Sequence, residues 1–130
     1  MGGTVRTLSE SDALDIMRSD GVVERLKVTP EVIEQGDLYL VNDRMLLVLI
    51  EHSENMVEAH IAQPKSNWTH IHTDIDQSLI FIQSVGYNKV YTNVRESLKT
   101  TLNLLKKHGF KHIDMIDGEV ILLWPSKQHY

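Results

Sequence analysis

The sequence predicts an α/β fold in which one mixed β-sheet carries helices on both faces. In some segments apolar residues recur at every second position, as in strands, and in others at spacings of three and four, as in amphipathic helices. In order, the segments give strand, helix, helix, three strands, helix, strand, helix and two strands. A helix that joins two strands predicts parallel neighbours, whereas two-residue turns predict antiparallel hairpins, so the sheet is expected to be mixed.

The N-terminal segments are expected to form an edge strand followed by short helices. Residues 4–8 suit the strand, and Ser9 is the expected N-cap of a helix that stops at Gly21. A second amphipathic piece is expected over residues 22–26. Residues 29–36 predict another short helix, because they begin with Thr-Pro and end with glycine.

The middle of the chain predicts an antiparallel meander of three strands: residues 38–41, 45–50 and 56–62. Asn42 and Asp43 suit the tight turn between the first two strands, and a polar turn near residues 53–55 joins the second to the third.

Residues 56–72 combine a strand, a break and the start of a helix, and the rest of the chain is arranged around them. In the strand, apolar side chains alternate with Glu58 and His60, which therefore share the opposite face. After the break at Pro64, one helical stripe comprises Trp68, Ile71, Ile75, Leu79 and Ile82. A strand that feeds a helix through a tight loop aims the helix's first amides and its positive dipole end at one spot, which is a candidate anion site.

The C-terminal part predicts a strand, a helix and a hairpin. Residues 89–92 form the expected strand, parallel to the preceding one. Asn93 is the expected N-cap of the last helix, and Glu96 completes a capping box. The expected buried stripe of this helix is Val94, Leu98, Leu102 and Leu105. The hairpin pairs residues 112–116 with 119–124 through an Asp-Gly turn.

Length, composition and charge narrow the class of protein. The chain has 130 residues, 42% hydrophobic and 24% charged, which fits a single soluble domain over residues 1–130. It contains no cysteine, which excludes disulfides and thiolate chemistry. A net charge of −5 argues against broad binding to nucleic acid phosphates. No apolar run reaches membrane-span length and the N-terminus has no apolar signal region, so no membrane partner and a cytoplasmic location are expected.

The run Ile-Ala-Gln-Pro at residues 61–64 and the run Leu-Leu-Lys-Lys-His-Gly-Phe at residues 104–110 resemble motifs of the GNAT superfamily of acyl-CoA N-acetyltransferases. The run at residues 61–64 resembles the end of the family's fourth strand, where a splayed backbone pairs with the pantetheine arm. The run at residues 104–110 resembles the penultimate-helix signature, and the order of elements agrees with the family over almost the whole chain. The resemblance implies a GNAT-like fold, acetyl-CoA as the donor co-substrate and an amine acceptor.

The loop after Pro64 departs from the family's pyrophosphate-binding pattern. That pattern is Arg or Gln, two residues, Gly, one residue, then Gly or Ala, and here Asn67, His70 and His72 stand at its fixed positions. Glycine lets the backbone approach phosphate closely, so the two imidazoles would either block the phosphates or contact them directly. Leu105 stands where the family often has a tyrosine that acts as general acid.

The resemblance carries over to a candidate site. Expected cofactor contacts are Ile61, Ala62, Asn67, Trp68, Thr69, His70 and Asn93. The backbone of the first two would align the thioester, amides of the next four would hold the pyrophosphate, and Asn93 would contact the CoA arm. Glu58 or His60, or a water that they order, would take the proton from the amine. The alternatives are an ordinary capped helix start, a capping role for Asn93, and polar side chains in a wet groove.

A metal site is the less favoured interpretation of the histidines. His60, His70 and His72, together with Asp74, have ligand chemistry that suits zinc or nickel. However, two residues that are two positions apart on a helix do not face each other. Polar residues that line a cleft are therefore the preferred interpretation, and no metal is predicted.

The sequence leaves two functions open. One is acetyl transfer from acetyl-CoA to a small-molecule or protein amine. The other is a non-catalytic binding or structural module that has lost the phosphate loop, as in some small virus-encoded proteins of this superfamily, which the chain also resembles. The exposed edge of the final hairpin leaves room for a homodimer.

Overall fold

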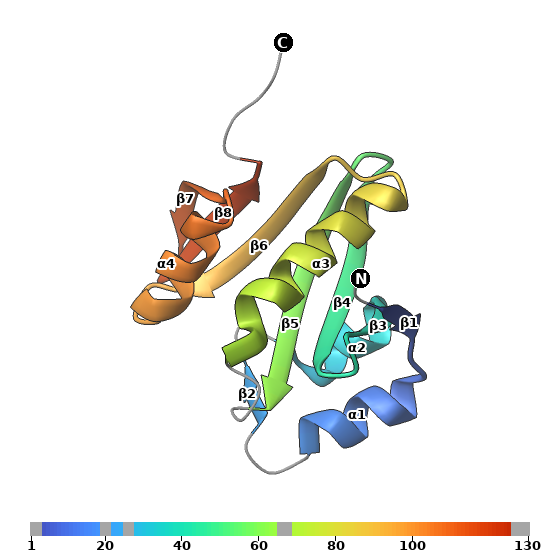
Figure 1. Ribbon diagram of the computed structural model, residues 1–130. Helices are drawn as coiled ribbons and strands as arrows, with labels where there is room; N and C mark the ends of the chain where they lie inside the picture. Colours follow the sequence, from blue (N-terminus) through green and yellow to red (C-terminus); the bar gives the residue numbers. More distant parts are fainter. Residues whose placement is uncertain (1–3, 19–21, 25–27, 65–68, 126–130) are drawn as a thin grey trace.

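The computed structural model describes residues 4–18, 22–24, 28–64 and 69–125. Its strands are β1 (Val5–Thr7), β2 (Val22–Glu24), β3 (Asp37–Val41), β4 (Met45–Ser53), β5 (Met56–Pro64), β6 (Lys89–Arg95), β7 (Lys111–Ile116) and β8 (Glu119–Trp124). Its helices are α1 (Glu10–Arg18), α2 (Pro30–Gln35), α3 (Ile71–Ser84) and α4 (Lys99–Lys107). Within these ranges eight strands form one mixed sheet in the order β1-β3-β4-β5-β6-β8-β7, with β2 paired to β5 beside that path (Figure 1). The predicted α/β class is therefore confirmed.

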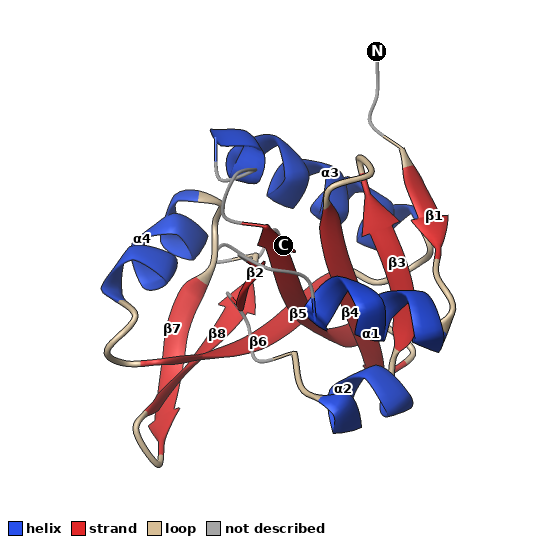
Figure 2. Cartoon of the chain, turned by 90° about the horizontal axis from the view of Figure 1, so that it is seen from below, coloured by secondary structure: helices blue, strands red, loops and turns tan. Residues whose placement is uncertain are grey.

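Helices cover both faces of the sheet, as predicted: α3 and α4 lie on one side of the strands, and α1 and α2 lie on the other (Figure 2). The larger core lies under α3 and includes Val57, Ala59 and Ile61 from β5, and Ile71, Ile75, Leu79 and Ile82 from α3. The smaller core lies under α1 and α2 and includes Ala13, Ile33, Leu46, Val48 and Ala62. Because successive strand residues alternate in direction, β5 turns Glu58 and His60 away from α3.

Several local signals act as the sequence predicts. Ser9 Oγ accepts a hydrogen bond of 3.1 Å from the N–H of Asp12 at the start of α1, and Thr29 caps α2 in the same way. Asn42 and Asp43 have φ of 53° and 56°, and the Asp-Gly turn of the last hairpin also has positive φ at both residues. Two successive residues with positive φ form a turn whose twist matches that of the flanking strands.

The predicted start of the last helix is wrong. Asn93 belongs to β6, whose pairing with β8 continues as far as Arg95. Helix α4 begins at Lys99, and its N-cap residue Leu98 is 40% exposed instead of buried. The ladder between two strands outweighs a four-residue capping signal, so Val94 is buried as a strand residue. The helix buries Thr101, Leu102, Leu104 and Leu105, which confirms the second half of the predicted stripe.

The amphipathic piece predicted over residues 22–26 contains a strand that the predicted order lacks. This strand, β2, runs antiparallel to the end of β5. The registered pairs are Val22↔Pro64, Val23↔Gln63 and Glu24↔Ala62. The predicted helix stop at Gly21 lies outside the described residues. Among the described residues, none of the helices combines the length and the hydropathy of a membrane-spanning segment.

Candidate active site

Strands β5 and β6 start as parallel neighbours and then separate, which forms a fork in the sheet (Figure 1). Their registered pairs are Met56↔Lys89, Val57↔Val90 and Glu58↔Tyr91. One residue further along, the hydroxyl of Thr92 donates a 2.9 Å hydrogen bond to the carbonyl of Ala59, so a side chain continues the contact where the ladder ends. The predicted parallel pairing is therefore confirmed, and the two strands diverge toward Pro64, as the resemblance of residues 61–64 to a splayed strand end implies.

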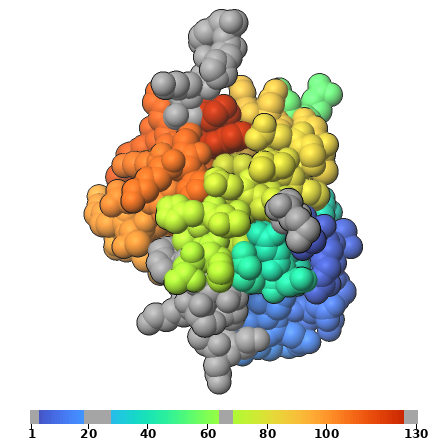
Figure 3. All heavy atoms as spheres, viewed as in Figure 1, coloured from blue at the N-terminus to red at the C-terminus, as the bar shows by residue number. Residues whose placement is uncertain are grey.

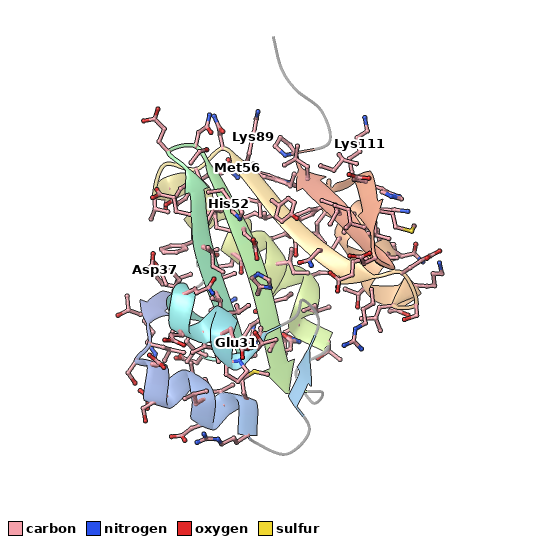
Figure 4. The ribbon with its side chains drawn as sticks, turned by 180° about the vertical axis from the view of Figure 1, so that it is seen from behind. Glu31, Asp37, His52, Met56, Lys89 and Lys111 are labelled. Atoms are coloured by element: carbon pink, nitrogen blue, oxygen red, sulfur yellow. The ribbon has the colours of Figure 1, made fainter. Side chains whose placement is uncertain are left out.

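Three polar side chains from β4 and β5 form a hydrogen-bonded cluster at the fork. The Glu58 carboxylate accepts one hydrogen bond from His60 Nε2 through Oε2 and another, of 2.7 Å, from His52 Nε2 through Oε1. Glu58 and His60 share a face, as predicted, and His52 joins them from the end of β4. Figure 4 labels His52 on the face of the sheet that is turned away from α3.

This cluster extends from the protein interior to solvent. The side chain of His60 is 3% exposed, that of Glu58 is 19% exposed and that of His52 is 41% exposed. Among the described residues, the second ring nitrogen of His52, Nδ1, has no hydrogen-bond partner. His52 is therefore the member of the cluster that an incoming substrate can reach.

Hydrogen bonds decide the ionisation of Glu58. The hydrogen bond from His60 holds the pKa of Glu58 below its ordinary value; the contact with His52 acts in the same direction, and burial opposes both. A carboxylate with a lowered pKa is a weak base, so Glu58 is poorly suited to take a proton from an amine near neutral pH. It is well suited to orient an imidazole and to stabilise the imidazolium that forms when the ring gains a proton.

Tyr91 stands beside this cluster as the last β6 partner of β5. Its ring centroid lies 5.6 Å from that of His52. Burial raises the pKa of Tyr91, and the charges of Glu58 and Asp114 raise it further, so the phenol keeps its proton at neutral pH. Leu105, which stands where the resemblance would place a tyrosine, is 2% exposed in the core. Helix α4 therefore has no tyrosine at residue 105 that could donate a proton, whereas Tyr91 of β6 carries a protonated hydroxyl beside the cluster.

The predicted phosphate site is described in part. Asn67 and Trp68 lie outside the described residues, whereas Thr69 and His70 are exposed at the start of α3. His70 is the N-cap of α3, and its side chain makes no capping hydrogen bond. One turn further along, Asp74 is fully buried and accepts hydrogen bonds from Arg44 Nη2 at 2.6 Å and Asn42 Nδ2 at 2.8 Å. These bonds fix the first turn of α3 to the β3–β4 turn.

The edge of β5 beyond the fork is paired with β2. Ala62 is registered with Leu46 of β4 and also with Glu24 of β2, so these two strands lie on opposite edges of β5. Strand β2 therefore runs along the same edge that β6 leaves at Glu58. According to the resemblance, the backbone of Ile61 and Ala62 at this edge would receive the pantetheine arm.

Two other predicted site residues have partners within the protein. Asn93 Nδ2 donates a 2.6 Å hydrogen bond to Glu119 Oε2 on the neighbouring strand β8. His72 Nδ1 lies 2.9 Å from His108 Nε2, and His108 Nδ1 lies 2.8 Å from Asp76 Oδ1, so this chain of contacts links α3 to the end of α4. The atoms of these two helices meet on the face seen in Figure 3.

The histidines of the possible metal site are consequently dispersed. His60 contacts Glu58 on one face of the sheet, and His72 contacts α4 on the other. Asp74 is held by Arg44 and Asn42. Within the described ranges, no three or more His, Asp or Glu side chains are grouped so that they could hold a metal ion.

His52 is the member of the cluster that sequence reasoning missed. The polar turn predicted near residues 53–55 is a usable signal, because a short hairpin brings residues on either side of its turn close together. However, the β4–β5 register shifts between Glu51 and Ser53, so an irregularity lies at residue 52. Such a bulge redirects a side chain in a way that strand alternation does not predict.

Comparisons with solved structures agree on the fold. The chain is similar to the ribosomal-protein-S18-alanine N-acetyltransferase from Escherichia coli, with a TM-score of 0.72, 11% identity and coverage of 98% of this chain and 96% of that one. It is similar to an IAA acetyltransferase from Bacillus cereus, with a TM-score of 0.70, 15% identity and coverage of 94% and 98%. It is also similar to a GNAT family acetyltransferase from Elizabethkingia anophelis with acetyl-CoA bound, with a TM-score of 0.69, 16% identity and coverage of 94% of this chain and 97% of that one. No family model and no curated protein matches the sequence.

These likenesses extend over nearly the full length of both chains at low identity. They show that the chain has the fold of the GNAT acyl-CoA N-acyltransferases, as the sequence resemblance implies, and that its structural neighbours are N-acetyltransferases.

Proposed function

We propose that the protein is an acetyl-CoA-dependent N-acetyltransferase that acts on an amine. The observation that carries this proposal is the cluster of Glu58, His52 and His60 at the fork between β5 and β6. A carboxylate that orients an accessible imidazole is a common arrangement for general base catalysis. The GNAT fold would hold a thioester at such a fork, because the separated edge of β5 is free of β6 there.

The residues of the cluster have distinct roles in this proposal. His52 Nδ1 takes the proton that the amine must lose before its nitrogen can attack a carbonyl carbon. Glu58 accepts the Nε2 hydrogen bond of the same ring and stabilises its charged form, while His60 holds Glu58 in place from the interior. Tyr91 keeps a proton that it can donate at the fork. Acetyl-CoA would supply the activated acetyl group, and no covalent intermediate on the protein is needed.

The fit to acetyl-CoA is partial. The exposed start of α3 at Thr69 and His70 suits an anion, because the first amides of a helix point outward and the helix dipole is positive there. In contrast, β2 occupies the edge of β5 at Ala62. This pairing favours a second candidate function, a GNAT-fold module that binds a partner without catalysis.

An assay of CoA release tests the proposal. Wild-type protein is incubated with acetyl-CoA and a panel of amines that includes polyamines, free amino acids and lysine peptides, and the free thiol is measured. We expect turnover with at least one class, and a loss of roughly 10²-fold or more in kcat for Glu58→Gln. Glu51→Gln is the matched control, because Glu51 accepts a hydrogen bond from Tyr87 away from the fork, and it should retain wild-type kcat. Equal rates for both variants would contradict the assigned role of Glu58.

A further inference from the structure

We propose that β2 is an internal competitor of acyl-CoA. Residues 22–24 pair with the edge of β5 that the pantetheine arm would use, so binding of acyl-CoA requires that β2 leave this edge. This inference rests on the proposed function, and it gives that function a means of regulation. It also accounts for the partial fit of the site without loss of the cofactor.

The register identifies the backbone groups of β5 that β2 occupies. In an antiparallel ladder, pairs that exchange two hydrogen bonds alternate with pairs that exchange none. Pro64 has no N–H, so its pair with Val22 cannot exchange two hydrogen bonds. The pair of Val23 with Gln63 must therefore carry both hydrogen bonds, and Glu24 faces Ala62 in a pair without them. The central contact of β2 is the peptide backbone at Val23.

Competition follows from the chemistry of a strand edge. An unpaired edge offers alternating N–H and C=O groups, and one strand-like ligand at a time can satisfy them. The pantetheine arm carries two amides in an extended chain, so it presents the same kinds of group as a short strand. Val23 occupies these groups at Gln63 directly after the residues, Ile61 and Ala62, that would align the thioester.

Release of β2 leaves the rest of the sheet intact. β5 is paired to β4 from Met56 to Ala62 on its other edge, and to β6 over its first three residues. β2 itself has only three residues. The two backbone hydrogen bonds between Val23 and Gln63 together change a population by roughly 5- to 160-fold, which is within the range that a ligand can displace.

The first test removes a hydrogen bond of β2 while changing little else. Val23→Pro has no N–H to donate to Gln63, whereas Val23→Ala keeps it and shortens the side chain. Acetyl-CoA binding is measured by calorimetric titration of both variants and the wild type. We expect the proline variant to bind roughly 2- to 12-fold more tightly than the wild type, in line with the loss of one hydrogen bond from the competitor. The alanine variant should stay near the wild-type affinity.

The second test fixes β2 in place. The natural sequence contains no cysteine, so Glu24→Cys with Ala62→Cys introduces a single pair. Opposite residues in a pair without hydrogen bonds have Cα atoms about 4.5 Å apart, which a disulfide can bridge. The oxidised protein should bind acetyl-CoA at least about tenfold more weakly than the same protein after reduction, because the bridge removes the open state. The reduced form is its own control for the two substitutions.

The outcomes separate this inference from the proposed function. If wild type, Val23→Pro and both redox forms bind acetyl-CoA equally, β2 does not compete, and the proposed function stands. If none of them binds at millimolar ligand, the proposed function fails and the inference fails with it. Should Val23→Pro not fold, as judged by its melting curve, the comparison of oxidised and reduced protein decides alone.

Discussion

Replacement of Asp74 by alanine tests how the first turn of α3 is fixed to the sheet. Asp74 is fully buried, and its carboxylate accepts hydrogen bonds from Arg44 Nη2 at 2.6 Å, Arg44 Nε at 3.3 Å and Asn42 Nδ2 at 2.8 Å. Its removal leaves a guanidinium, 27% exposed, without its counter-charge, and leaves the Asn42 amide without this acceptor.

The expected loss follows from these contacts. Loss of one partner from a buried ion pair costs about 3–5 kcal/mol, and access of Arg44 to solvent reduces this, so we expect Asp74→Ala to lower the free energy of unfolding by about 2–4 kcal/mol. The melting temperature should fall by roughly 10 °C for a chain of this size. Arg6→Ala is the control, because its pair with Asp43 is exposed on both sides and should contribute less than about 1 kcal/mol.

A double-mutant cycle identifies the cause of the loss. Chemical denaturation is measured for Asp74→Ala, Arg44→Ala and the double variant. The double variant should lose less than the sum of the two single losses, because each single change leaves one charged group unpaired. A loss below about 1 kcal/mol for Asp74→Ala, or strict additivity in the cycle, would refute the view that this ion pair anchors α3.

Three further predictions concern the core, the cluster and the phosphate end of α3. Leu102→Ala should cost about 2–5 kcal/mol in denaturation, and a cost below about 1 kcal/mol would place this side chain outside the core. Because folding lowers the pKa of Glu58, its ionised carboxylate stabilises the folded state above the ordinary pKa, and this stabilisation disappears as pH falls through the lowered value. The difference in the free energy of unfolding between wild type and Glu58→Gln should therefore shrink in acid. A difference that stays constant with pH would contradict this prediction. His70 is the exposed N-cap of α3, so its ring can donate a hydrogen bond to a phosphate, and His70→Gly should weaken acetyl-CoA binding by roughly 2- to 12-fold in calorimetric titration. Equal affinity of the variant and the wild type would mean that His70 points away from the phosphates.

The sequence was most informative where periodicity and turn chemistry agree. The strand, helix and strand from Met56 to Arg95 form a parallel pair because the connection leaves few alternatives, and the Asp-Gly turn of the last hairpin requires residues that tolerate positive φ. The alternation in β5 also placed Glu58 and His60 together on one face. These features depend on residues that are close in the sequence.

The features that the sequence did not predict depend on contacts between residues that are distant in the sequence. The capping signal at Asn93 was overridden because β8, more than twenty positions later, extends β6 to Arg95. The strand β2 forms only because the far end of β5 offers an edge. His52 reaches Glu58 through an irregularity of the hairpin. A local pattern carries no information about such long-range contacts, so neither the full cluster nor the covered edge could be predicted.

A thermal melting curve with and without acetyl-CoA decides whether this protein binds the co-substrate that the proposed function requires. A ligand that binds only the folded protein raises its stability by RT ln(1 + [L]/Kd), which is about 2.7 kcal/mol at one hundred times Kd. We predict a rise in the midpoint that grows with the acetyl-CoA concentration and is smaller for adenosine 3′,5′-bisphosphate, which lacks the pantetheine arm. An unchanged midpoint at millimolar acetyl-CoA, for the wild type and for Val23→Pro alike, would contradict the proposed acetyltransferase function and favour the non-catalytic module.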